Sequence, residues 1–98
     1  MFINIIDSYR KIIAICDSEL LGKKFEQGKF QLDVKECFYK GNKFNEEQAI
    51  EILKKGIIED ATFNIVGKKS TQIALKAGII TQEGIKTIQN IPFALILI

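Results

Sequence analysis

The chain has 98 residues, of which 47% are hydrophobic and 27% charged, a composition typical of one small globular domain. It contains no histidine and only two cysteines, which excludes histidine-based acid–base catalysis and leaves too few ligands for a zinc site. The net charge of +2 is smaller than the strongly basic balance of most nucleic-acid-binding domains, and Arg10 is the only arginine. These features predict a chain without catalytic residues, metal or cofactor, and they make an enzyme the less favoured class.

The N-terminal third predicts a β-hairpin and then a helical turn. Residues 2–7 and 11–16 are rich in isoleucine, which favours strands, and the polar residues between them suit a turn. Asp17 can begin a short helical turn that Gly22 ends.

The middle of the chain predicts a strand followed by the clearest helix. Apolar and polar side chains alternate over residues 30–34, which is the period of a half-buried strand. Asn45 is a good N-cap for a helix over residues 46–55, with Gln48 as its reciprocal partner and Gly56 as its end. The apolar stripe of this helix consists of Ala49, Ile50, Leu53 and Ile57.

The C-terminal half predicts one more helix and three strands. The expected order is strand 62–65, helix 69–77, strand 85–89, a turn at 90–92 and strand 93–98. The last segment is apolar throughout, which is typical of a strand covered on both faces. The whole chain, residues 1–98, is therefore expected to form a single α+β domain. Its single mixed or mostly antiparallel sheet would carry two main helices packed on it.

The two cysteines are Cys16 and Cys37, and their spacing matches no redox or metal motif. We interpret both as small apolar core residues rather than as a disulfide.

The first candidate site is the predicted start of the second helix. Its residues are Gly67, Lys68, Lys69, Ser70 and Thr71. They resemble the end of a phosphate-binding loop, but position 62 is threonine where that loop requires glycine. Free N–H groups at a helix N-terminus, together with the two lysines, could still hold a phosphate or carboxylate. The alternative is that both lysines point into water and the helix begins near Ser70.

The second candidate site is the basic middle of the chain. Residues 23–43 contain six lysines and three acidic residues, with aromatic residues interleaved, a pattern that single-stranded nucleic acid binding can use. The candidate phosphate contacts are Lys23, Lys24, Lys40 and Lys43, with Tyr39 as the stacking residue. The alternative is a set of core aromatic residues beside solvated lysines.

The chain resembles a small archaeal family that is catalogued as domain of unknown function 424. The resemblance rests on residues 16–25, Gly28, Leu32, Val34 and 38–41 in the first half, and on residues 64–67, Ala74 and 77–80 in the second. It covers most of the chain and implies an archaeal, cytoplasmic, single-domain protein, with an informal association with translation. The family usually ends in Val-Pro-His-Ala-Gln, whereas this chain has Phe93 and Leu95 in place of the histidine and glutamine. Any role of that polar pair is therefore absent here.

Together these observations predict a cytoplasmic, non-catalytic module that binds RNA or a ribonucleoprotein particle linked to translation. The alternative is a protein–protein adaptor or structural subunit whose apolar C-terminal strand pairs with a protein partner or with a second copy. A membrane protein is not expected, because the apolar C-terminal stretch is much shorter than the roughly 20 residues that span a bilayer.

Overall fold

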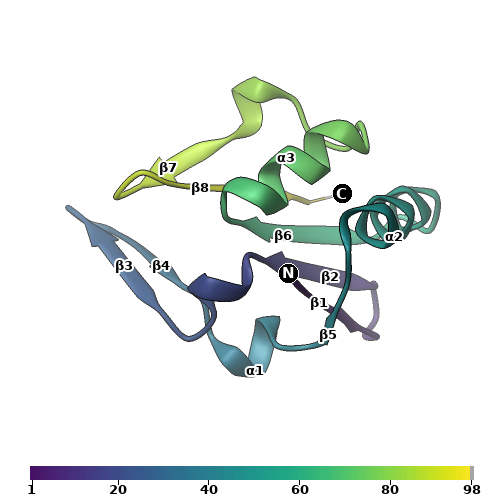
Figure 1. The fold of residues 1–98 in the computed structure, drawn as a ribbon, viewed down its shortest axis with the longest axis horizontal. Helices are drawn as coiled ribbons and strands as arrows, with labels where there is room; N and C mark the ends of the chain where they lie inside the picture. Colours follow the sequence, from purple (N-terminus) through teal and green to yellow (C-terminus); the bar gives the residue numbers. More distant parts are fainter. Residues whose placement is uncertain (98) are drawn as a thin grey trace.

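The computed structural model describes residues 1–97, and its centre is a six-stranded sheet (Figure 1). The strands of this sheet are β1 (Phe2–Ile6), β2 (Ile12–Cys16), β5 (Asn42–Lys43), β6 (Thr62–Val66), β7 (Lys86–Ile88) and β8 (Ile91–Ile96). Their order is β5-β1-β2-β6-β8-β7. The pair β2–β6 is parallel, and the other pairs are antiparallel. The prediction of a mostly antiparallel α+β fold is confirmed.

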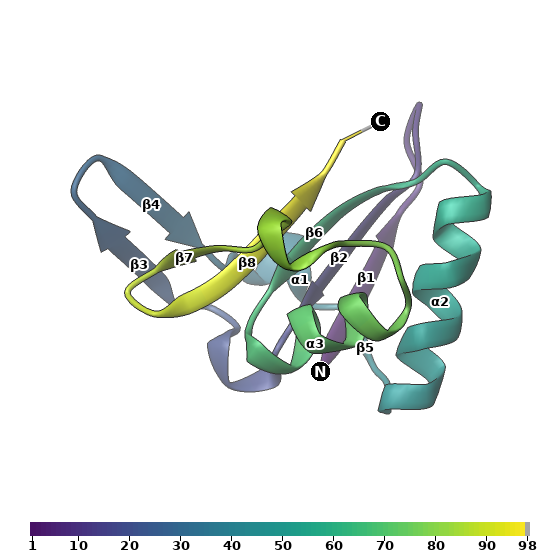
Figure 2. The ribbon, with the colours of Figure 1, turned by 90° about the horizontal axis from the view of Figure 1, so that it is seen from above.

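Two helices cover one face of the sheet, and a smaller layer covers part of the other (Figures 1 and 2). The helices on the first face are α2 (Glu46–Ile58) and α3 (Lys68–Lys76). The smaller layer consists of the 3-10 helix η1 (Ser18–Leu20), α1 (Glu36–Tyr39), and a separate hairpin of β3 (Lys24–Gln27) and β4 (Phe30–Asp33). A second 3-10 helix, η2 (Gln82–Gly84), precedes β7.

The central strand β2 is buried on both of its faces. Ile13 and Ile15 point into the core beneath α2 and α3, whereas Ala14 and Cys16 belong to the core beneath η1, α1 and the hairpin. Strand side chains alternate between faces, so one isoleucine-rich segment supplies both cores. The predicted hairpin of β1 and β2 is confirmed.

Helix α2 begins as predicted but does not end at Gly56. The Asn45 side chain accepts a hydrogen bond from the Gln48 N–H at 2.8 Å, and the Gln48 side chain accepts one from the Asn45 N–H at 3.1 Å. Gly56 is instead a buried position at which α2 packs on the sheet, because a Cβ there would lie 2.5 Å from Ile13 Cδ1. The predicted apolar stripe is wrong at Ile57, which is 39% exposed.

The basic middle of the chain contains three elements that the sequence did not predict, namely β3, α1 and β5. Strand β3 pairs with β4 through a turn at Gly28, and the short helix α1 follows. Residues 30–33 do form strand β4, but their burial does not alternate as predicted: Phe30, at 71% exposure, and Gln31 are both exposed, and Leu32 and Asp33 are both half-buried.

The last strand also differs from the prediction. The turn before it is formed by Gln89 and Asn90, which both have positive φ, so that Pro92 already lies in β8. Leu95 is 57% exposed and Leu97 is 76% exposed, so the expectation of a strand covered on both faces is wrong. The final residue of the predicted segment, residue 98, lies outside the described residues. No helix in residues 1–97 has the length and apolar character needed to cross a membrane.

Candidate functional site

The carboxyl ends of the two parallel strands meet at Asp17 and Gly67. Cys16 is the register partner of Val66, and the Asp17 N–H donates to the Val66 carbonyl at 3.1 Å. Asp17 is only 3% exposed, which is unusual for a carboxylate and requires compensating hydrogen bonds.

The compensation comes from the first turn of α3. Asp17 Oδ1 accepts hydrogen bonds from the Ser70 N–H at 2.8 Å and from the Ser70 hydroxyl at 2.7 Å, and Oδ2 accepts one from the Lys69 N–H at 3.1 Å. A negative charge at a helix N-terminus is stabilised by the unsatisfied N–H groups and by the helix dipole. Asp17 therefore caps α3 from a distant part of the chain. It makes no side-chain capping bond to η1, the helical turn that it directly precedes.

This cap corrects the prediction of a free helix N-terminus. The helix begins at Lys68, and the N–H groups of Lys69 and Ser70 are already used by a carboxylate of the same chain. Ser70 is fully buried and Thr71 is 3% exposed, with its hydroxyl donating to the Gly67 carbonyl at 2.8 Å. Gly67, Ser70 and Thr71 thus have structural roles, and only the two lysine side chains are exposed.

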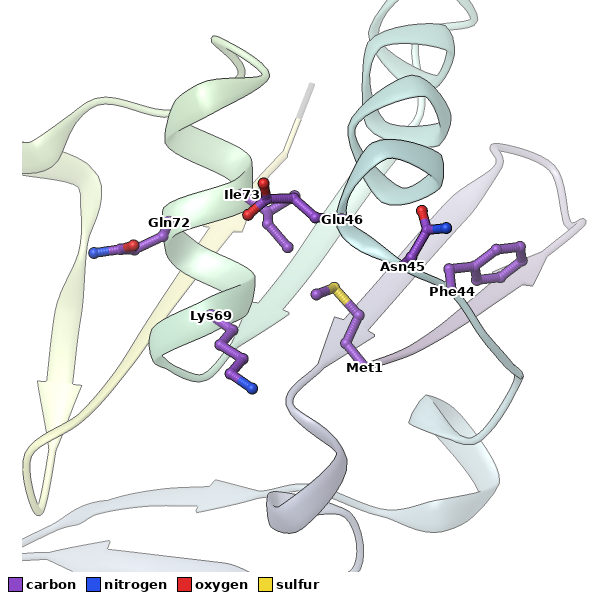
Figure 3. A pocket seen from close by; sticks show the side chains of 7 residues that line it. All are labelled: Met1, Phe44, Asn45, Glu46, Lys69, Gln72 and Ile73. Atoms are coloured by element: carbon purple, nitrogen blue, oxygen red, sulfur yellow. The ribbon is translucent and has the colours of Figure 1, made fainter.

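The two lysines border shallow cavities on either side of the first turn of α3. Lys69 lines a 340 Å³ cavity together with Met1, Phe44 and Glu46, and Figure 3 shows its side chain extending from the helix toward the level of Met1. Glu46 is engaged elsewhere, because it pairs with Lys76 at 3.1 Å. Lys68 and Lys69 both line a second cavity, of 330 Å³, beside Asp17. The Lys69 and Ser70 amide groups are therefore occupied, whereas both ammonium groups remain available.

Lys43 lies at the same end of the sheet. It is the register partner of Phe2 in β1, Phe2 is the partner of Cys16, and Cys16 is the partner of Val66. The Lys43 ammonium lies 5.2 Å from the centroid of the Phe2 ring, a cation–π contact.

The remaining predicted lysines are also exposed. Lys23 follows η1, Lys24 begins β3, and Lys40 follows α1. Lys24 is 4.0 Å from Glu26, the outer limit of an ion pair. Within residues 1–97, the five lysines without an ion pair in this set are Lys23, Lys40, Lys43, Lys68 and Lys69.

The structure excludes Tyr39 as a surface stacking residue. Its side chain is 6% exposed, and its ring packs edge-on against Phe38 at a centroid distance of 5.1 Å. Burial, followed by the nearby Cys16, raises the pKa of the Tyr39 hydroxyl to about 12. The ring belongs to the second core, and the prediction of base stacking on the surface by Tyr39 is wrong.

Phe93 and Leu95, at which this chain departs from the expected polar pair, line one small cavity. The cavity has a volume of 150 Å³, and Tyr39 and Asn64 line it as well. The sequence did not indicate that these four positions lie together, because they come from α1, β6 and β8.

The two cysteines have different environments. Cys16 is buried, and burial together with the adjacent Asp17 charge raises the pKa of its thiol to about 11. Cys37 is exposed, so its predicted place in the core is wrong; both thiols are free. In the described part of the chain, no three histidine, cysteine, aspartate or glutamate side chains form a set of metal ligands.

We expect a thiol reagent such as dithionitrobenzoate at pH 8 to modify Cys37 and leave Cys16 unmodified. A pKa of about 11 leaves about one Cys16 thiol in a thousand as the reactive thiolate at that pH. The folded Cys37→Ser variant should release no thionitrobenzoate from the reagent until denaturant exposes Cys16. Rapid reaction of two thiols in the folded protein would contradict the burial of Cys16.

The chain is thus a small α+β protein in which the aspartate that follows one of two parallel central strands caps the helix that follows the other strand. A family model described as "Protein of unknown function (DUF424)" matches residues 6–98, and the chain belongs to this family. No curated protein sequence matches the chain.

A solved structure has a similar fold. It is described as the crystal structure of an uncharacterized conserved protein from Methanopyrus kandleri. The TM-score is 0.87 at 21% identity, over 97% of this chain and 88% of that chain. At this identity the likeness establishes the shared fold.

Proposed function

We propose that the protein is a cytoplasmic, non-catalytic module that binds single-stranded RNA, alone or on a ribonucleoprotein particle of the translation machinery. The observation that supports the proposal is that five of the six lysines predicted to contact phosphate are exposed and make no ion pair among the described residues. Other lysines of the same chain do pair with acids, namely Lys11 with Glu59 and Lys76 with Glu46. These five lysines are therefore positive charges that an RNA backbone can use.

Recognition would depend on lysine side chains rather than on the amide groups of α3. The carboxylate of Asp17 already occupies the Lys69 and Ser70 N–H groups, so the RNA phosphates would contact the ammonium groups of Lys68 and Lys69. A lysine ammonium contacts phosphate as a point charge and carries no direct sequence information. The module would therefore bind RNA with strong salt dependence and weak sequence preference.

The test is a fluorescence anisotropy titration of labelled single-stranded RNA across a range of salt concentrations. We expect the double variant Lys68→Gln/Lys69→Gln to reduce the slope of log affinity against log salt by about 1.4, which is about 0.7 for each lost phosphate contact. Glutamine is one atom shorter than lysine, is uncharged and has a similar helix propensity, so the fold should be unaffected.

The matched control is Lys54→Gln/Lys55→Gln on the exposed face of α2, which removes the same charge elsewhere. The proposal predicts that this control leaves the slope nearly unchanged. An equal reduction in both double variants would mean that only net charge matters, and absent binding at low salt would refute the proposal.

A second candidate function, self-association as a structural subunit, is favoured by the exposed end of β8. Strand β7 pairs with β8 only as far as Phe93. Ile88 and Ile91 pair across a two-residue turn, so the backbone N–H and C=O groups of Ile91 point toward β7. Backbone groups of alternate residues in a strand point to the same side, so those of Leu95 and Leu97 also point to the β7 side, beyond the end of β7. We call residues 95–97 the open β8 edge; among the described strands, none pairs with it on that side.

A second copy of the chain would fit this edge in an antiparallel arrangement. A two-fold axis at Ile96 would place Leu95 of each copy opposite Leu97 of the other, which buries two exposed leucines of each copy and pairs their backbone groups. Sedimentation velocity should then show a concentration-dependent dimer that Leu95→Lys/Leu97→Lys converts to monomer. A wild-type monomer at every concentration would refute self-association.

A further inference from the structure

The 150 Å³ cavity beside Tyr39 has features of a ligand site that the five unpaired lysines do not provide. It lies between β4 of the hairpin and the adjoining strands β6 and β8 of the sheet. Its walls include the apolar side chains Leu32, Phe93 and Leu95, and its polar side chains are Gln31, Tyr39 and Asn64. Gln31 and Leu95 are exposed, so the cavity opens to solvent between the hairpin and β8.

Tyr39 and Asn64 are the two of these polar side chains that are not exposed, and neither has a hydrogen-bond partner among the described residues. The Tyr39 side chain is only 6% exposed, yet its hydroxyl makes no hydrogen bond within residues 1–97. No side-chain oxygen or nitrogen in that part of the chain is both fully buried and unpartnered, so the hydroxyl must reach solvent. The cavity that Tyr39 lines provides that access. The Asn64 carboxamide is likewise unpartnered, whereas Asn4 on the same face donates to the Phe38 carbonyl at 2.8 Å.

The size and charge of the cavity limit the ligand. A cavity of about 150 Å³ is large enough for one six-membered aromatic ring. None of its lining side chains is charged, which favours a neutral molecule, because a charge placed there would lose its hydration without a partner. The unpartnered hydroxyl and carboxamide require a ligand that carries both hydrogen-bond donors and acceptors.

We propose that this cavity binds a neutral six-membered heterocycle of the pyrimidine-base type, held by the Tyr39 hydroxyl and the Asn64 carboxamide. The ring would lie against the apolar side chains of Phe93 and Leu95, and its polar edge would face the two unpartnered groups. A pyrimidine base has N–H and C=O groups on one edge that match a carboxamide and a hydroxyl. The choice of a base among neutral heterocycles rests on the proposed RNA-binding function, whereas the choice of a neutral single ring rests on the cavity alone.

The Tyr39 hydroxyl would act as a hydrogen-bond donor at any physiological pH. Burial raises the pKa of Tyr39 to about 12, so the hydroxyl keeps its proton well above neutrality. The position of the hydroxyl is also fixed, because its ring is held in the core between α1 and the sheet.

The test is a titration of the folded protein with uridine, at millimolar concentration, followed by amide chemical shifts. We expect saturable shifts at residues 64 and 93–95, and we expect Tyr39→Phe to weaken binding about three- to tenfold, because it removes one hydrogen bond to the ligand. Phenylalanine preserves the buried ring, so this variant should fold. The control is Tyr9→Phe, since Tyr9 is fully exposed in the turn between β1 and β2. Absence of shifts at these residues, or equal binding by Tyr39→Phe, would overturn the proposal.

Two comparison ligands separate the proposal from simpler explanations. Toluene has a similar ring without polar groups, and equal affinity for toluene and uridine would overturn the role of the two polar side chains. Adenosine has two fused rings, and binding of adenosine as tight as that of uridine would overturn the single-ring size.

Single-stranded oligouridine distinguishes a free nucleoside from a base within RNA. If the base comes from RNA, Tyr39→Phe weakens oligouridine binding, while Lys68→Gln/Lys69→Gln lowers its salt dependence. If the ligand is a free nucleoside, uridine responds to Tyr39→Phe and oligouridine does not. Uridine binding without any oligouridine binding would leave this proposal intact and refute the proposed RNA-binding function.

Discussion

Replacing Asp17 with alanine is expected to lower the free energy of unfolding by about 2–4 kcal/mol. The substitution removes a buried carboxylate that accepts three hydrogen bonds, and it leaves the N–H groups of Lys69 and Ser70 without an acceptor at the start of α3. Unsatisfied buried polar groups destabilise more than the lost bonds themselves contribute, which sets the size of the effect. Equilibrium unfolding in urea measures it directly.

Two further variants separate the cap from a general effect of charge. Glu19→Ala removes an exposed acid two residues away and should change the stability by less than about 0.5 kcal/mol. In a double-mutant cycle with Ser70→Ala, the combined loss should be smaller than the sum of the two single losses, because the two side chains share a hydrogen bond. Strict additivity, or an Asp17→Ala variant as stable as wild type, would contradict the cap.

Replacing Gly67 with alanine is expected to destabilise the protein by about 2–4 kcal/mol. Gly67 has φ 114° and ψ 160°, a conformation that only glycine adopts without strain. A Cβ at this position would also collide with the carboxylate of Asp17. The glycine is therefore required both by the backbone turn from β6 into α3 and by the close approach of the capping group.

A second glycine gives the matched control. Gly78 also has positive φ, at 75°, but nothing lies within 4 Å of the position that its Cβ would occupy. Gly78→Ala should therefore show only the strain of the left-handed backbone, about 1 kcal/mol. Thermal or urea unfolding measures the stability of the two variants. Equal losses of unfolding free energy in Gly67→Ala and Gly78→Ala would contradict the predicted collision with Asp17.

The sequence predicts those parts of the fold that depend on local signals. The capping box of Asn45 and Gln48 identifies the start of α2, and the two isoleucine-rich segments identify the first hairpin, because each signal lies within a few residues. The end of α2 is not local. Gly56 has the usual signal of a helix end, but its small size instead permits close packing on Ile13 of the sheet.

The capped end of α3 was missed for the same reason. Asp17 and Ser70 are 53 residues apart, and a local reading assigns Asp17 as the cap of the helical turn that it precedes. The parallel pairing of β2 and β6 brings the two residues together, and strand order cannot be obtained from a single sequence. The observable signal was an aspartate directly after an apolar strand segment, a residue type that is rarely buried without a partner.

The interleaved lysines and aromatic residues of the basic middle correctly predicted which lysines are exposed, but not which aromatic residues are exposed. Each predicted lysine is exposed, because a lysine ammonium is rarely buried unless it is paired. Aromatic residues do not follow such a rule. Phe30 is exposed and Tyr39 is buried, although both lie in the same basic stretch, because α1 turns Tyr39 toward the sheet.

The measurement that most directly tests RNA binding by Lys43, Lys68 and Lys69 is amide chemical-shift mapping with a short single-stranded RNA at low salt. The account predicts shifts around Lys43, Lys68 and Lys69, at the end of the sheet where Asp17 caps α3, and predicts that added salt reverses them. Absence of shifts at low salt, or shifts confined to the open β8 edge, would contradict it.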